Sequence, residues 1–167
     1  MNFAVQLEHD AGTPPDVVYR WDRDTDILSA RLRTETPVEG IAGAVEVAGD
    51  DGSWLILDVS AGRIRGVEVA VWPDLTTRAV LAPPKPVAAG RAVLRAAGEH
   101  AESPALHIAT ALSAEADQSE RTIHFRVGSR RDVRPVRVGR DLLFELDADD
   151  RLAGVWLLNV PPFPADA

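Results

Sequence analysis

The feature that most constrains the fold is an alternation of apolar and polar residues with a period of two. This period places successive side chains on opposite faces of a β-strand, and few stretches keep a helical period for three turns. In the first half, the runs that predict strands are 17–21, 27–33, 44–48, 53–59 and 64–72. Turn-forming clusters at 22–26 and 49–52 predict hairpins between neighbouring runs. The sequence therefore predicts an all-β protein with little helix.

The same pattern occurs twice, which predicts a tandem duplication of one β unit. Residues 55–59 (LILDV) align with 142–146 (LLFEL), and 63–67 (RIRGV) align with 151–155 (RLAGV). The offsets are 87 (142 − 55) and 88 (151 − 63), so the second turn is one residue longer. We expect two antiparallel meanders packed as one pseudo-symmetric sandwich or barrel. Chance similarity is the alternative, because strand–turn–strand patterns are common.

Upstream of these segments the alignment is weaker. The strand expected at 17–21 corresponds to 105–109, and the strand expected at 27–32 corresponds to 122–127. This alignment makes 105–109 and 122–127 a second hairpin, with a longer loop at 113–120. We therefore expect these two segments to pair.

One alanine-rich segment, 88–101, could form either a strand or a short helix. We favour a strand, because residues 91–97 would then copy the N-terminal strand at 2–8. A run of prolines at 82–86 predicts a stiff linker. The predicted organisation, within one compact domain, is a first β repeat at 1–82, a linker at 83–90, a second β repeat at 91–160 and a tail at 161–167.

Two segments carry a family resemblance: YRWDRDTDILSARL at 19–32 and LDVSAGRIRGVEV at 57–69. Together they resemble domain-of-unknown-function family 2283, a family of small bacterial β-rich proteins. The resemblance covers about residues 17–72, with a degenerate echo at 133–160. The chain departs from the family pattern at Trp21, where tyrosine is usual, and at Trp156, which takes the position of Glu68 in the first copy. The resemblance implies a bacterial β protein but no known activity and no catalytic residues.

Composition excludes several classes of protein. The chain has no cysteine, which excludes disulfides, thiolate metal sites and a cysteine nucleophile. Its net charge of −8 argues against a nucleic-acid-binding protein. The N-terminus lacks the basic and apolar regions of a signal peptide, and no apolar run reaches the roughly 18 residues of a membrane span. We expect a cytoplasmic protein without membrane contact.

Positive charge is concentrated in residues 121–140. This segment holds seven arginines and one aspartate, a net charge of +6, and leaves −14 for the rest of a chain of net charge −8. Such separation can bind acidic or phosphate-rich partners, or it can protect an edge strand against aggregation. The predicted polar recognition face consists of Arg130, Arg131, Arg134 and Arg137.

Several predicted strands carry apolar residues on both faces, which predicts that both faces are at least partly covered. Trp54, Trp72 and Trp156 lie on the second face of their strands. They can fill the space between the two copies, or they can anchor an interface with another chain. The leading prediction is a non-catalytic interaction module that uses these tryptophans to bind a protein partner or a second copy of itself as a homodimer.

The alternative prediction is a small-ligand-binding protein or an enzyme with a pocket between the two repeats. Tyr19, Glu68 and Asn159 are the polar candidates for such a pocket. Asn159 shares a strand face with Val155 and Leu157, so it is expected to be buried and to need hydrogen-bond partners. A cavity on the order of several hundred cubic ångströms would distinguish a pocket from a closed core.

Metal, cofactor and catalytic motifs are weak. His107 and His124 lie on strands predicted to pair and could hold a transition metal, but no third ligand is specified. Residues 22–26 have the aspartate spacing that opens a calcium loop, yet Ile27 and Arg33 replace its glycine and glutamate. Phosphate-loop and nucleophile-elbow patterns do not occur. We therefore predict no cofactor, no resident metal and no catalytic residue.

Overall fold

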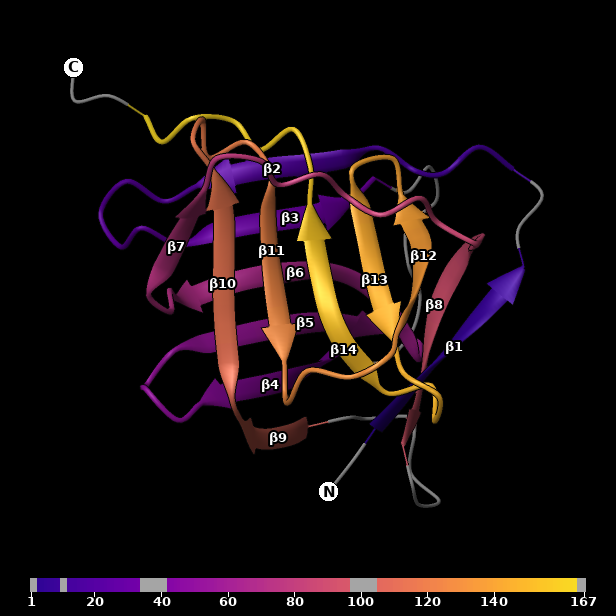
Figure 1. Ribbon diagram of the computed structural model, residues 1–167. Helices are drawn as coiled ribbons and strands as arrows, with labels where there is room; N and C mark the ends of the chain where they lie inside the picture. The colour runs from indigo at the N-terminus through magenta and orange to yellow at the C-terminus, as the bar shows by residue number, and fades with distance from the viewer. Residues whose placement is uncertain (1–2, 10–11, 34–41, 97–104, 165–167) are drawn as a thin grey trace.

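The computed structural model describes residues 3–9, 12–33, 42–96 and 105–164, and these form an all-β structure (Figure 1). The all-β prediction is confirmed, and the described residues include no helix that could cross a membrane. The strands are β1 (Phe3–His9), β2 (Val17–Trp21), β3 (Leu28–Leu32), β4 (Ala42–Gly49), β5 (Trp54–Ser60), β6 (Arg63–Val71), β7 (Leu75–Arg78), β8 (Ala88–Ala96), β9 (Ala105–Thr110), β10 (Leu112–Asp117), β11 (Ile123–Val127), β12 (Arg134–Gly139), β13 (Leu142–Leu146) and β14 (Leu152–Leu157).

One mixed sheet contains all of these strands and curls into two layers. Its order is β7-β10-β11-β14-β13-β12-β8-β6-β5-β4-β9, with β1 beside β8 and the β2–β3 hairpin beside β6. In Figure 1, the layer from β10 to β12 runs across the layer formed by β2 to β6. Strand β8 links the layers, because it pairs with β12 in parallel and with β6 in antiparallel.

Each half of the chain forms a five-stranded unit with the same strand order. The first unit is β2-β3-β6-β5-β4, and the second is β10-β11-β14-β13-β12. The registers also correspond: Gly66 lies between Arg31 and Asp58, and Gly154 lies between Arg126 and Glu145. This correspondence agrees with the predicted duplication, which itself stays a prediction.

The predicted pairing of 105–109 with 122–127 is wrong. Strand β9 pairs in parallel with β4, and β11 instead pairs with β10. Strand β10 occupies much of the segment predicted as a loop. Its inward residues, Leu112, Ala114 and Ala116, are buried, but two of them are small alanines. They alternate with polar residues, so the strand has the polar composition of a loop.

The segment at 88–96 is strand β8, as favoured from the sequence, and residues 97–101 lie outside the described part. Strand β8 pairs antiparallel with β1 along all seven residues of β1. Gly90 permits this pairing, because a Cβ there would lie 2.3 Å from the carbonyl oxygen of Glu8. Strand β8 begins within the predicted linker, and β7 crosses to pair with β10. Strands of the first half therefore pair with strands of the second half: β7 with β10, and β1 with β8.

The core lies between the two layers. Strand β5 alternates strictly, with Leu55, Leu57 and Val59 buried and the intervening residues half-buried. Every residue of β14 is buried, so the predicted covering of both faces holds for this strand. Phe125 and Phe144 are among the largest fully buried side chains. They fill the core from the strands on either side of β14.

Candidate functional site

A cleft of about 640 Å³ opens between the two halves of the chain. Its walls come from the segment before β2, the end of β3, the start of β6, strand β8 and the end of β12. This volume lies within the range of roughly 300–1,000 Å³ that is usual for small-molecule sites. The lining residues are Gly12, Thr13, Pro14, Pro15, Asp16, Leu32, Arg33, Arg63, Ile64, Arg65, Ala89, Gly90, Arg91, Ala92, Arg137, Val138 and Arg140.

Arginine dominates the charge of this cleft. The first half contributes Arg33, Arg63 and Arg65, and the second half contributes Arg91, Arg137 and Arg140. Asp16 is the one carboxylate among the described lining residues. Six guanidinium groups against one carboxylate give the described lining of the cleft a net positive charge, within a chain of net charge −8.

Arg65 is the central residue of the cleft in electrostatic terms. Its side chain is half-buried, and its Nε is fully buried without a hydrogen-bond partner. Burial, together with the positive charges of Arg63 and Arg91, lowers the pKa of the Arg65 guanidinium. A buried donor without an acceptor is costly, and like charges nearby add to that cost. An anion in the cleft would offset the repulsion between these positive charges.

The other arginines of the cleft differ in their contacts. Arg63 lies 3.4 Å from a carboxylate oxygen of Glu8, and Arg140 lies 3.3 Å from one of Asp16. Both pairs are partly exposed, so they contribute little stability and can exchange partners. In the described ranges, no carboxylate lies within ion-pair distance of Arg33 or Arg65.

Backbone hydrogen bonds fix the rim of the cleft. The amide of Arg140 donates to the carbonyl of Pro15 at 2.8 Å, and the amide of Arg33 donates to the carbonyl of Asp16 at 2.8 Å. These bonds fasten the loop after β12 and the end of β3 to the segment before β2. Gly139 allows the close approach, because a Cβ there would lie 2.6 Å from Leu32. Backbone hydrogen bonds therefore join the two halves at the rim of the cleft.

The three predicted tryptophan anchors lie at three separate places. Trp156 is 6% exposed and stacks on His124 with a centroid distance of 4.3 Å. Trp72 stacks on Trp21 at 5.7 Å, and its Nε1 donates to the carbonyl of Asp26 at 2.8 Å. Trp54 is half-buried and meets the ring of His107 edge-on. The structure does not gather these tryptophans into one apolar patch.

The four predicted arginines also divide between different roles. Arg131 donates to a carboxylate oxygen of Asp147 at 2.9 Å and to the carbonyls of Val127 at 2.9 Å and Ser129 at 2.7 Å. Arg134 donates to the carbonyl of Asp147 at 3.1 Å. Both side chains therefore hold the β13–β14 turn. Arg137 lines the cleft, whereas Arg130 is exposed on the loop before β12.

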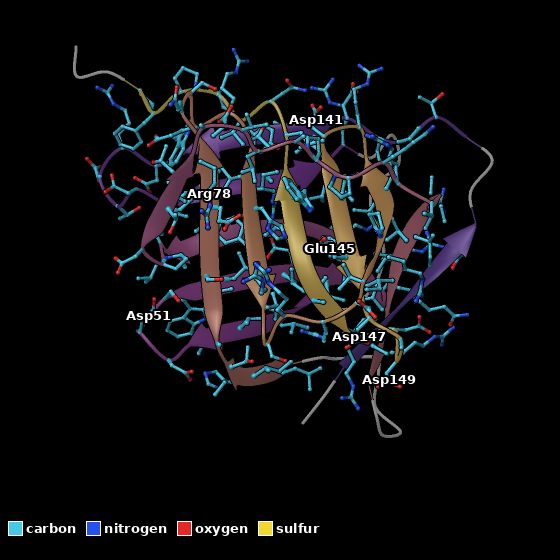
Figure 2. All side chains as sticks on the ribbon, viewed as in Figure 1. Asp51, Arg78, Asp141, Glu145, Asp147 and Asp149 are labelled. Carbon is cyan, nitrogen blue, oxygen red and sulfur yellow. The ribbon has the colours of Figure 1, made fainter. Side chains whose placement is uncertain are left out.

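Asp147 is the acceptor at the centre of this turn (Figure 2). Burial alone would raise its pKa. Hydrogen bonds from the Arg131 side chain and from the backbone amides of Arg151 and Asp149 outweigh burial and lower the pKa of the Asp147 carboxyl. The carboxylate is thus held ionised as part of the fold.

The predicted pocket residues lie outside the cleft. Tyr19 donates through its hydroxyl to the carbonyl of Leu158 at 2.7 Å, and Glu68 accepts from the hydroxyl of Ser29 at 3.3 Å. Asn159 is exposed and donates to Asp141 at 2.8 Å, so the expectation that it is buried is wrong. Strand β14 ends at Leu157, and the backbone of Asn159 is left-handed (φ 52°). The alternation of strand faces that predicted a buried side chain therefore does not extend to Asn159.

The two histidines do not meet. His107 is exposed on β9, and His124 is buried on β11 against Glu145. The strands are separated because β9 pairs with β4. Residues 22–26 form a hairpin turn in which the Asp22 carboxylate accepts from the amide of Asp24 at 3.0 Å. Within the described part of the chain, no three His, Asp or Glu side chains converge as a metal site.

Sequence reasoning identified Arg137 but missed the other arginines of the cleft. Arg63 and Arg65 share one face of β6 by their spacing of two, which was a readable signal. They line the same cleft as Arg137 and Arg140 because β8 pairs with both β12 and β6, and no local sequence pattern predicts that pairing. Comparison of the chain with protein-family models and with curated proteins finds no match. The resemblance to family 2283 therefore stays a prediction.

Proposed function

We propose that the protein is a non-catalytic binding module that holds a small organic anion in the cleft between its two halves. The observation that carries this proposal is the arginine lining of the cleft, in which the half-buried Arg65 lies near the positive charges of Arg63 and Arg91. The proposal follows the ligand-binding alternative predicted from the sequence, with arginines in place of the polar residues named there.

The proposed ligand carries two or more phosphate or carboxylate groups. Guanidinium groups bind such groups through pairs of parallel hydrogen bonds. The arginines enter from β6 in one half and from β12 and its following turn in the other. A ligand with a single charged group would engage one wall only. A ligand with two such groups can bridge both walls.

A protein partner docked on the tryptophans has less support. Trp72 and Trp156 are already packed against Trp21 and His124. Arg131 and Arg134, from the predicted recognition face, are bonded within the β13–β14 turn. These contacts favour a structural role for most of the residues that the interaction hypothesis requires.

Native mass spectrometry of the untagged protein with inorganic pyrophosphate tests this function. We expect a 1:1 adduct with the wild type and a strongly reduced adduct with Arg65→Gln. The matched control is Arg20→Gln, which removes an exposed arginine of β2 outside the cleft and should keep the adduct. No adduct, or equal adducts for both variants, would overturn the proposal.

Three further proposals rest on the sequence: a tandem duplication, action in a bacterial cytoplasm, and self-association as a homodimer. The same spectra test self-association. A species of twice the 18.0 kDa chain mass supports a homodimer, and a monomer at every accessible concentration contradicts it.

A further inference from the structure

A second feature lies on the outer face of the layer formed by β11, β14 and β13. Figure 2 shows Glu145 in the middle of this layer. A short hydrogen bond of 2.5 Å joins Glu145 Oε1 to His124 Nε2 across β14, and Trp156 stacks on the imidazole. Gly154 lies beneath the pair, because a Cβ there would lie 2.1 Å from Glu145 Oε1. The glycine thus makes room for a carboxylate–histidine pair that is largely shielded from water.

The register-equivalent positions of the first half have a different arrangement. There Arg31 lies beside Gly66 and forms an ion pair with Asp58 at 3.8 Å. In the second half, Arg126 takes the position of Arg31 and Glu145 takes that of Asp58. Glu145 is hydrogen-bonded to His124, so it does not form with Arg126 the ion pair that Asp58 forms with Arg31.

Arg126 therefore lies half-buried without an ion-pair partner in the described part of the chain. It borders a hollow of about 120 Å³ beside the His124–Glu145 pair. Arg130 also borders the hollow without such a partner, whereas Arg131 is bound to Asp147. The lining residues are His124, Arg126, Ser129, Arg130, Arg131, Val133, Glu145 and Ala153. None of them lines the larger cleft.

We propose that this hollow is a second binding site, specific for a small oxyanion such as a sulfate, a phosphate or a single phosphoryl group. Arg126 and Arg130 supply the positive charge and the N–H donors. Glu145 orients the imidazole of His124 through Nε2, as a carboxylate commonly orients a histidine. No described residue bonds the other ring nitrogen, Nδ1, which is free to donate to the anion when the ring is protonated.

Two carboxylates face His124 from nearby strands. Glu145 faces the ring from β13, and Glu115 faces it from β10. Glu115 is itself bound to Arg78 at 2.9 Å, which leaves Glu145 as the carboxylate that acts directly on His124.

The test is an NMR titration of the full chain with sodium sulfate. We expect a saturable shift of the His124 ring resonances. Arg126→Gln should weaken binding by about tenfold, because it removes a charge-assisted hydrogen bond. Arg130→Gln should also weaken sulfate binding. Because Arg130 is exposed, this variant tests the site even if Arg126→Gln does not fold.

Two matched variants complete the experiment. Arg31→Gln removes the register-equivalent arginine of the first half, and Arg65→Gln removes the main residue of the cleft. Both should leave the sulfate response of His124 unchanged. A response that is absent, or that Arg31→Gln weakens as much as Arg126→Gln does, would overturn the second site. Neither outcome bears on pyrophosphate binding in the cleft, so the two proposals fail separately.

Discussion

The hydroxyl of Tyr19 donates to the carbonyl of Leu158 at 2.7 Å, and this bond joins β2 of the first half to the segment that follows β14 of the second. The carbonyl of Asp141 lies 3.3 Å from the same hydroxyl. Two residues further along β2, the indole of Trp21 donates to the carbonyl of Pro161 at 2.9 Å. These bonds close one side of the interface between the halves, and the arginine-lined cleft is open elsewhere along it.

Tyr19→Phe should lower the free energy of unfolding by about 1 kcal/mol, because it leaves the Leu158 carbonyl without this donor. Urea unfolding monitored by tryptophan fluorescence measures the change. Burial, with the nearby Asp141 charge, raises the pKa of Tyr19. The unfolded chain therefore loses this proton at a lower pH than the folded chain does. The wild type should lose stability above about pH 10, and Tyr19→Phe should lack that loss. Identical alkaline profiles would contradict the account.

Arg131→Ala should destabilise the protein by about 2 kcal/mol, since hydrogen bonds to a charged group contribute about 1.5–3 kcal/mol. The substitution removes the donor to Asp147 and to the backbone carbonyls of Val127 and Ser129. Arg130→Ala is the neighbouring control and should change stability by less than about 0.5 kcal/mol, because Arg130 is exposed. Equal effects of the two substitutions in thermal unfolding would show that the hydrogen bonds of Arg131 do not stabilise the fold.

Asp147 predicts a specific acid sensitivity. Its pKa is lowered in the folded state, so its carboxylate contributes stability above its ordinary pKa of about 3.9. That contribution is lost as the pH falls through the lower folded value. Asp147→Asn should be less stable than the wild type at neutral pH and should show a shallower decline between about pH 4 and pH 2. Parallel curves from urea unfolding across this range would contradict the assignment.

Gly154→Ala should destabilise the fold, because the new Cβ would lie 2.1 Å from Glu145 Oε1 and 3.1 Å from His124 Nε2. A cost of about 1–3 kcal/mol is expected for such overpacking. Shortening Glu145 removes the closest clash, so Gly154→Ala should cost less in a Glu145→Ala background. A double-mutant cycle from chemical unfolding measures this coupling. Strictly additive effects would mean that Gly154 does not accommodate the carboxylate.

Sequence patterns predicted local structure better than the cleft, for physical reasons. Turn chemistry at 22–26 and 49–52 predicted two hairpins of the first half correctly, because a turn fixes the pairing of the strands beside it. The partner of β9 is β4, some sixty residues away, and no turn specifies that pairing. Arg65 and Arg137 line the same cleft only because β8 connects the two layers. The side chain of Glu145 reaches His124 because Gly154, between them, has no Cβ.

The central claim is that arginines from both halves bind one anion, and isothermal titration calorimetry with inorganic pyrophosphate tests it most directly. An Arg126→Gln background removes the proposed second site from the measurement. We predict one molecule bound per chain, affinity that falls as salt is added, and a loss of about tenfold or more for Arg65→Gln but not for Arg20→Gln. Absence of binding, or equal affinities for the two variants, would contradict the account.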